Sequence, residues 1–263
     1  MLDKLKIISI DRILTFESPA KERSIKKADE IEKNGKLRNP LLARPFGDRY
    51  LLLDDTSILA ALERLQISHI PIQIADPQTL TLHPWQRVTE EWKKEDLSEF
   101  CQAFPRQLTL HEHPQGELEI YQTEVRFSDK SIYRLSFASP SLITRADLCI
   151  KLLARIGSSF RVKLDYNNAD PLADFPGATA VVYPPAFTID DLSVLAASGV
   201  RLPHGLVRID QPGRILGIDY SLSILGEPVS PEEKESFLRE LIRIRMSSER
   251  VAYYDGYVLV FNN

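Results

Sequence analysis

Two adjacent carboxylates, Asp54 and Asp55, followed by Thr56 and Ser57, lie where an apolar segment gives way to a helical pattern. A helix that begins there has free backbone N–H groups, which favour anions such as phosphate oxygens. Two carboxylates repel a bare phosphate, but a Mg²⁺ ion between carboxylate and phosphate reconciles them. Alternatively, the acidic residues only cap the helix and complement its dipole. The residues alone leave open whether Asp54 and Asp55 are metal ligands, with Thr56 and Ser57 at phosphate oxygens.

Glu17 is a second candidate for chemistry, since it lies in a loop flanked by Phe16 and Pro19. A carboxylate in a partly apolar loop can act as a general base, although a surface glutamate is the simpler interpretation. Arg23 follows on the next helical pattern. Its guanidinium is a candidate anion ligand or a partner of Glu22.

The helix that carries Arg23, and the segment after it, concentrate cations. They are Lys21, Lys26, Lys27, Lys33, Lys36 and Arg38. Either this is a solvated face or it contacts a nucleotide or nucleic acid. The whole chain has 33 Lys and Arg against 37 Asp and Glu, a net charge of −4. Because no global positive field exists, we expect DNA to bind weakly, if at all, and without sequence preference.

The composition is that of a globular protein, with 263 residues, 43% hydrophobic and 27% charged. This length allows one large domain or two smaller ones. The two cysteines, Cys101 and Cys149, cannot form a disulfide framework or a four-ligand zinc site, and reduced cysteines suit a cytoplasmic protein. Charges interrupt the first 16 residues, and no apolar run approaches the ~18 residues of a membrane span. We therefore expect a cytoplasmic protein without a membrane partner.

The elements that position these side chains are clearest in the first 76 residues. Ser18-Pro19 is typical of a helix start, and Asn34-Gly35 of a helix end. Gly47-Asp48 between two apolar segments predicts a hairpin. The predicted order is β-α-β-β-α-β, with strands at residues 5–10, 41–43, 50–53 and 69–75 and helices at 18–34 and 54–66.

The remainder of the chain has a mixed pattern that begins with a connector at residues 77–92. Thr188 with Asp191, and Ser230 with Glu233, are typical of capped helix starts. The other predicted elements are hairpins at 117–137 and 253–261, a helix at 145–156 and a strand at 178–183. We expect residues 81–263 to form an α+β portion that packs on the first unit and makes a cleft.

The β-α-β-β-α-β unit resembles a ParB/sulfiredoxin-type domain, and the chain is similar to the free L-serine kinase branch of that superfamily. That family carries a catalytic Glu before its first helix and an Arg shortly after it. Glu17 and Arg23 match these residues, and Pro40-Leu41-Leu42 matches the Pro-led strand that follows.

The family next has an Asp-Gly-x-His-Arg turn that binds the nucleotide phosphates. Asp54 matches its Asp, whereas Asp55, Ser57 and Ile58 replace its Gly, His and Arg. These replacements remove donors to a polyanion, and an Ile cannot supply the bidentate bonds of a guanidinium. A kinase with this turn therefore needs a metal at Asp54 and Asp55, or Lys and Arg side chains from elsewhere.

The C-terminal half is also similar to the family, in the stretch Arg201 to Ile209 that corresponds to a segment near the amino-acid substrate. Arg208 is kept there, while Val207 and Ile209 replace Thr and His. Trp85 lies where a substrate-side Trp occurs in the family. The resemblance implies that Arg208 and Trp85 bind the substrate.

The resulting expectation is an α/β (α+β) protein with a ParB/sulfiredoxin-like domain at residues 1–80 and a second domain at 81–263. The resemblance implies a free amino acid kinase that transfers phosphate from ADP or ATP to L-serine or a similar hydroxyl, with Mg²⁺. Glu17 would be the general base, and its carboxyl would lie within about 10 Å of that of Asp54. The alternative is a non-catalytic relative that binds a ligand, DNA or a protein.

Overall fold

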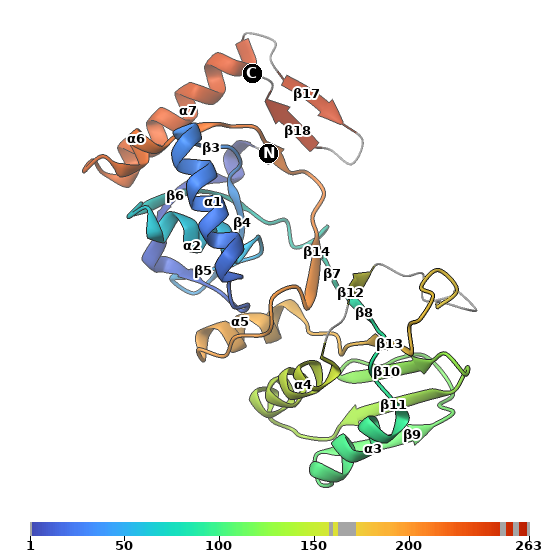
Figure 1. The fold of residues 1–263 in the computed structure, drawn as a ribbon. Helices are drawn as coiled ribbons and strands as arrows, with labels where there is room; N and C mark the ends of the chain where they lie inside the picture. The colour runs from blue at the N-terminus through green and yellow to red at the C-terminus, as the bar shows by residue number, and fades with distance from the viewer. Residues whose placement is uncertain (1, 158–159, 163–171, 248–250, 255–257, 262–263) are drawn as a thin grey trace. The chain divides into compact units, whose positions relative to one another are not determined.

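The computed structural model describes residues 2–157, 160–162, 172–247, 251–254 and 258–261 (Figure 1). The chain divides into two units, the first made of Met1–Thr81 and Ile209–Asn263 and the second of Leu82–Arg208. It passes between them within β7 (Thr81–Pro84) and again within β14 (Val207–Asp210). The predicted single portion at 81–263 is therefore divided, because residues 209–263 belong to the first unit. The expected cleft between two portions stays a prediction.

A five-stranded sheet of order β1-β6-β4-β5-β2 forms the centre of the first unit. β1 runs antiparallel to β6, and β4 runs parallel to β6. The predicted hairpin is confirmed, since Phe46 pairs with Arg49 across Gly47, whose φ of 60° suits glycine in a tight turn. The strands are β1 (Leu5–Ser9), β2 (Ile13–Leu14), β4 (Leu41–Phe46), β5 (Arg49–Leu52) and β6 (His69–Ile74).

Two helices connect these strands, α1 (Lys21–Asn34) and α2 (Thr56–Arg64), and they pack against each other. Short 3-10 turns occupy Leu2–Lys4 and Ile10–Arg12. α1 begins later than the predicted start at Ser18, because Ala20 is its N-cap and the backbone N–H of Ser24 donates to Ala20 O. It ends as predicted at Gly35, which has the left-handed φ of 64°.

The C-terminal segment completes the first unit. β16 (Tyr220–Ser221) pairs with β3 (Lys36–Leu37), and α7 (Pro231–Ser247) packs against β1. The predicted capped start at Ser230 is confirmed by reciprocal bonds with Glu233 of 3.0 and 3.2 Å. The turn of the predicted last hairpin lies outside the described residues. The other elements are β15 (Ile215–Leu216), α6 (Leu222–Gly226), β17 (Val251–Tyr254) and β18 (Val258–Phe261).

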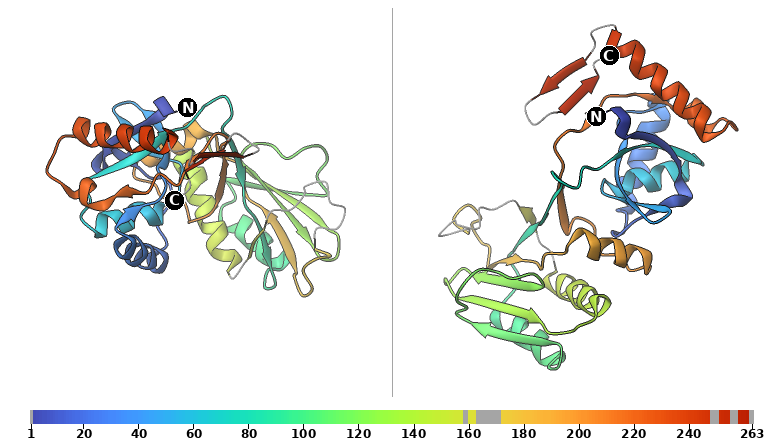
Figure 2. Two further views of the ribbon diagram at one scale, coloured as in Figure 1. Left: turned by 90° about the horizontal axis from the view of Figure 1, so that it is seen from above. Right: turned by 180° about the vertical axis from the view of Figure 1, so that it is seen from behind.

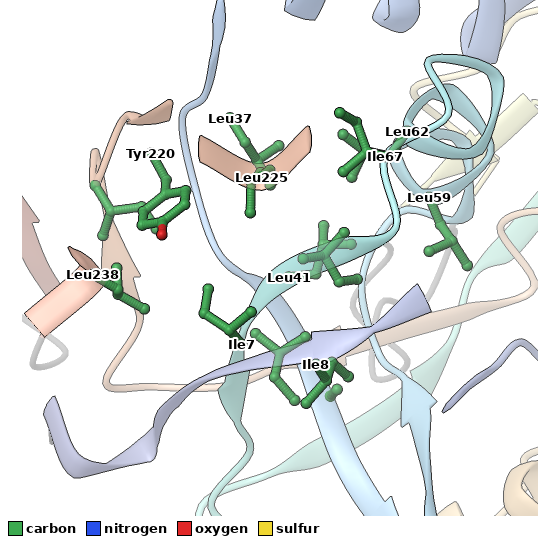
Figure 3. Close-up of a cluster of buried hydrophobic side chains, with 14 of the residues drawn as sticks. Ile7, Ile8, Leu37, Leu41, Leu59, Leu62, Ile67, Tyr220, Leu225 and Leu238 are labelled. Atoms are coloured by element: carbon green, nitrogen blue, oxygen red, sulfur yellow. The ribbon is translucent and has the colours of Figure 1, made fainter. Parts of the chain in front are cut away.

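One apolar core joins the two segments of the first unit (Figure 3). Leu41 and Leu62 come from the first segment, and Tyr220, Leu225 and Leu238 from the second, and each is at most 1% exposed. Full burial of one such leucine contributes about 1.5–3 kcal/mol. Residues 209–263 are therefore part of the core of this unit.

A six-stranded sheet of order β12-β8-β13-β10-β11-β9 forms the second unit (Figures 1 and 2). Alternation along β13 divides its faces: Ala180 and Val182 pack into the core with α3 and α4, whereas Val181 and Tyr183 lie in a separate cluster. The strands are β8 (Gln86–Thr89), β9 (Leu108–Glu112), β10 (Gln122–Phe127), β11 (Ile132–Phe137), β12 (Phe160–Val162) and β13 (Ala180–Tyr183).

The helices of the second unit are α3 (Lys94–Ala103), α4 (Leu142–Ile156) and α5 (Ile189–Ala197). The predicted capping box of α5 is confirmed, since Thr188 and Asp191 exchange bonds of 2.8 and 3.1 Å. The predicted connector at residues 77–92 instead contains β7 and β8. Within the described ranges, no helix is long and apolar enough to span a bilayer.

Candidate anion-binding site

The start of α2 is closed by its own N-cap. The Asp55 carboxylate accepts a 2.9 Å bond from Ser57 N, and Arg23 Nη2 lies 2.6 Å from the other Asp55 oxygen. Cap and ion pair both stabilise the positive end of the helix. The structure therefore brings Arg23 and Asp55 together, as a pair in which the cation already has an anionic partner.

Thr56 and Ser57 are almost inaccessible, with exposed fractions of 4% and 0%. Their hydroxyl oxygens are buried and have no hydrogen-bond partner among the described residues. Because Ser57 N donates to Asp55, the first turn does not present Ser57 to a phosphate from solvent in this structure. The predicted phosphate contacts at Thr56 and Ser57 stay a prediction, which this burial does not favour.

Asp54 has a different partner, Arg214, which is distant in sequence. Arg214 Nη2 donates to Asp54 Oδ2 at 2.8 Å and to Pro40 O at 3.3 Å. Leu42 N donates to the same Asp54 oxygen at 3.1 Å, and Asp55 N donates to the other oxygen at 2.9 Å. About one fifth of the Arg214 side chain and one quarter of the Asp54 side chain remain exposed.

A pocket of about 430 Å³ opens beside this ion pair, within the first unit. Its size is in the range of small-molecule sites. Four cationic side chains and two acidic ones line it: Lys27, Lys36, Arg38 and Arg214 against Glu30 and Asp54. The apolar part of the wall comes from Ile31, Leu37, Leu41, Ile58 and Leu216. The excess of cations, together with the apolar part of the wall, suits an anionic ligand that also carries an apolar group.

Sequence reasoning missed Arg214 and this pocket as a site. The isoleucine at position 58 predicted that either a metal at Asp54 and Asp55 or cations from elsewhere are needed, but nothing in the local pattern pointed to a residue 160 positions beyond Asp54. The basic side chains Lys27, Lys36 and Arg38 were noticed as a cationic surface, and the structure places them in the pocket wall.

The Asp54 and Asp55 carboxylates do not fit the predicted Mg²⁺ site in this arrangement. Three of their four oxygens accept a hydrogen bond from a backbone N–H or from Arg214, and the fourth, Asp55 Oδ2, lies 2.6 Å from Arg23 Nη2. Mg²⁺ needs free oxygen ligands in near-octahedral geometry. In the described part of the chain, no three His, Cys, Asp or Glu side chains converge as a metal site. We derive no step through a metal held by these residues.

Glu17 is buried, with an exposed fraction of 7%, in the loop between β2 and α1. It therefore belongs to the same unit as Asp54, and burial suits a carboxylate that acts as a general base. The predicted separation of about 10 Å between the Glu17 and Asp54 carboxyls stays a prediction.

Trp85 and Arg208 both belong to the second unit, and the structure brings them together. The Arg208 guanidinium carbon lies 5.5 Å from the centre of the Trp85 ring, and Trp85 N donates to Leu206 O at 2.9 Å. A cation over an indole is stabilised by about 0.5–1 kcal/mol or more.

Neither cysteine is suited to nucleophilic chemistry. Burial raises the pKa of the Cys101 thiol to about 11 and that of Cys149 to about 12. Both are protonated near neutral pH, whereas the thiolate is the reactive form. Neither thiol therefore enters the candidate chemistry.

Comparison with known proteins identifies the fold. No protein-family model matches the chain, and no curated protein matches its sequence. Among solved structures, SbnI with C-terminal truncation from Staphylococcus aureus matches with a TM-score of 0.75 and 15% identity, covering 93% of this chain and 98% of that one. The chain is thus a mixed α/β protein with a ParB-like fold.

Free serine kinase structures also match. One in complex with AMP has a TM-score of 0.64 and 18% identity, covering 84% of this chain and 93% of that one. A glutamate-to-alanine variant in complex with ADP has a TM-score of 0.63 and 16% identity, covering 84% and 94%. The chain therefore shares the fold of SbnI and free serine kinase, and the resemblance inferred from its sequence is confirmed at the level of fold.

Proposed function

We propose that the protein is a free amino acid kinase that transfers phosphate from ADP or ATP to the hydroxyl of L-serine or a similar small substrate. The observation that carries this proposal is the cation-rich pocket beside the Asp54–Arg214 pair, in a chain with the fold of a kinase whose structures hold AMP and ADP. Phosphoryl transfer depends mainly on positioning and on neutralising phosphate charge, which is what this pocket offers.

On the donor side, Lys27, Lys36, Arg38 and Arg214 neutralise the nucleotide phosphates, and the apolar wall receives the base. Asp54 accepts a hydrogen bond from Arg214 and so orients its guanidinium. In this proposal Asp54 does not bind a resident metal. Any divalent cation enters with the nucleotide, as part of the substrate. This assignment moves the phosphate contacts from the capped first turn of α2 to the neighbouring pocket.

On the acceptor side, Glu17 takes the proton from the substrate hydroxyl as the phosphoryl group is transferred. Arg208 binds the substrate carboxylate through charge-assisted bonds, beside the Trp85 ring. Residues 17 and 208 match the family's motif positions, and the burial of Glu17 supports its role as a base.

The second candidate is a non-catalytic protein that binds a ligand, DNA or a protein partner with the same scaffold. The specific observation in its favour is the closed start of α2, where Asp55 takes the N–H group of Ser57. This alternative keeps ligand binding in the pocket but has no phosphoryl transfer.

A direct assay separates the two candidates. Purified protein is incubated with Mg²⁺, L-serine and either ADP or ATP, and O-phosphoserine is quantified by mass spectrometry. We expect O-phosphoserine from wild-type protein, and a loss of at least 100-fold in Glu17→Gln, because a general base contributes about 10²–10⁴-fold. Glu22→Gln, which changes an exposed glutamate in the first turn of α1, is the matched control and keeps wild-type activity.

Nucleotide binding without O-phosphoserine, with L-serine and other hydroxy amino acids alike, would support the non-catalytic protein. Equal activity in Glu17→Gln and Glu22→Gln would remove Glu17 from the mechanism.

A further inference from the structure

We propose that Gln73 is a positioning residue of the nucleotide pocket: its buried amide fixes the backbone on both sides of Arg214 and so sets the guanidinium against Asp54. This inference rests on the proposed function, because it concerns how the same pocket holds its donor. Gln73 itself does not line that pocket, so it acts through Arg214.

The side-chain amide of Gln73 forms hydrogen bonds to the backbone on both sides of Arg214, and we call these two bonds the bracket. Its Nε2 donates to Gly213 O at 2.6 Å, and its Oε1 accepts a 2.9 Å bond from Ile215 N. Gly213 and Ile215 are the two neighbours of Arg214. The bracket therefore restrains the backbone immediately before and after the residue whose side chain reaches Asp54.

The position of Gln73 makes the bracket rigid. The residue lies in β6, with Leu5 of β1 on one side and Leu42 of β4 on the other, and is 2% exposed. A buried amide is costly unless its polar atoms are hydrogen-bonded. Gln73 is a polar residue between Ile72 and Ile74 in the strand HIPIQI, and its two bonds to residues 213 and 215 account for its presence there.

The same pocket wall is held at its other end. Asn39 Oδ1 accepts a 2.8 Å bond from Gly217 N, and the Ile215 side chain is wholly buried. Residues 213–217 thus form a strap fixed to β6 by Gln73 and to the segment before β4 by Asn39. Arg214, Leu216 and Gly217 from this strap line the pocket.

An Arg214 whose backbone and side chain are held in place binds an anion more tightly than an Arg214 that is free to move. The guanidinium is already placed by Asp54 and Pro40, so little side-chain freedom is lost when a phosphate arrives. Without the bracket, Arg214 keeps its charge but its backbone can adopt other positions. Loss of Gln73 should therefore weaken nucleotide binding only through Arg214.

A double-mutant cycle tests this coupling. The affinity for ADP is measured by isothermal titration calorimetry in wild-type protein, Gln73→Leu, Arg214→Met and the double variant. We expect Gln73→Leu to weaken ADP binding about 5–10-fold and Arg214→Met at least 10-fold. The double variant should bind ADP within about 2-fold of Arg214→Met, because residues that act as one unit are not additive.

Gln211→Leu is the matched control. Gln211 also tethers the C-terminal segment, by bonds to Asp76 N at 2.9 Å and Thr79 Oγ1 at 2.8 Å, but it does not line the pocket. Its loss should leave the ADP affinity within about 2-fold of wild type. Equal weakening of ADP binding in Gln73→Leu and Gln211→Leu would instead indicate a general loosening of the C-terminal segment and would count against a specific role of Gln73.

Gln73→Glu serves if Gln73→Leu does not fold. Glutamate keeps the acceptor for Ile215 N but places a carboxylate oxygen against Gly213 O, so it should also weaken ADP binding through Arg214. Unchanged ADP affinity in a folded Gln73 variant, or additive losses in the double variant, would overturn the positioning role. Failure of wild-type protein to bind ADP or ATP would overturn the proposed function and this inference with it.

Discussion

In the second unit, Glu124 lies between Arg126 at 2.9 Å and Arg134 at 2.8 Å, and only 3% of the Glu124 side chain and 7% of that of Arg134 are exposed. The two terminal nitrogens of Arg134 also donate to three carbonyls, those of Gln115, Gly116 and Glu117. In the first unit, Asp54 and Arg214 form a pair of similar length that is about one fifth to one quarter exposed at a pocket.

The comparison separates charge used for structure from charge available to a ligand. The Glu124 network pairs its charges internally and, through Arg134, holds the loop at residues 115–117 onto the sheet. Desolvated pairs of this kind are sensitive to the loss of one partner, because the other charge is left buried. The Asp54–Arg214 pair remains partly solvated, so a ligand can compete for its guanidinium.

The largest effect is expected from breaking the buried network. Glu124→Leu leaves the Arg134 guanidinium without its carboxylate and should destabilise the second unit by about 3–5 kcal/mol. Both tryptophans of the chain, Trp85 and Trp92, lie in this unit, so denaturant unfolding followed by tryptophan fluorescence reports on it specifically. ADP binding by the first unit should be unchanged. A loss below about 1 kcal/mol would mean that the network is not structural.

Arg208→Ala is the next largest. If Arg208 binds the substrate carboxylate, the variant should melt near the wild-type temperature without ligand but lose the stabilisation that L-serine gives, which follows mass action. Differential scanning fluorimetry with increasing L-serine measures both. A variant that melts much earlier yet keeps its stabilisation by L-serine would assign Arg208 to structure.

A smaller effect concerns pH. Burial, and then the charge of Lys234, lower the pKa of His69 below its usual 6.5. Just below pH 6.5, the unfolded state therefore binds more protons than the folded state. The free energy of unfolding is at its full value above pH 6.5 and declines as pH falls from 6.5 toward the lower pKa of folded His69. In far-UV circular dichroism melts between pH 7 and 5, His69→Gln should show a shallower decline than wild type. His111→Gln, an exposed histidine of β9, should keep the wild-type slope.

The smallest effect is expected from metal removal. Because arginines and backbone N–H groups occupy the Asp54 and Asp55 oxygens, EDTA should change the affinity of the apo pocket for ADP by less than about 3-fold. Calorimetric titrations with ADP in EDTA and in Mg²⁺ check this. A loss of 10-fold or more in EDTA would restore the metal-bridged site that the paired aspartates suggested.

Local signals predicted most of the first sheet and its helices, because β-branched runs, the Gly47 turn and the Gly35 helix end are encoded over a few residues. The capped starts at Thr188 and Ser230 were predictable for the same reason. α3 and β9 lacked such a distinct pattern and were missed. The helix α1 begins after Ala20 and not at the predicted Ser18, so a favourable cap sequence does not by itself place the first turn.

The site was only half predictable. Asp54 and Asp55 lie in one local motif, the strand-to-helix turn, but the pairing of Arg23 in α1 with Asp55 joins two helices and was not predicted. Arg214 and Gln73 act through contacts that span well over one hundred residues, and the return of the chain to the first unit has no local signal. A polar Gln73 within an apolar strand was the available clue, since a buried amide needs partners.

Hydrogen–deuterium exchange of wild-type protein with and without saturating ADP tests the central claim, that the first unit holds the nucleotide in the pocket beside Asp54 and Arg214. We predict slower exchange in residues 34–41 and 213–217, which form two of its walls, and unchanged exchange in the Glu124 network of the second unit. Protection by ADP confined to the second unit, with none in residues 34–41 or 213–217, would contradict the account.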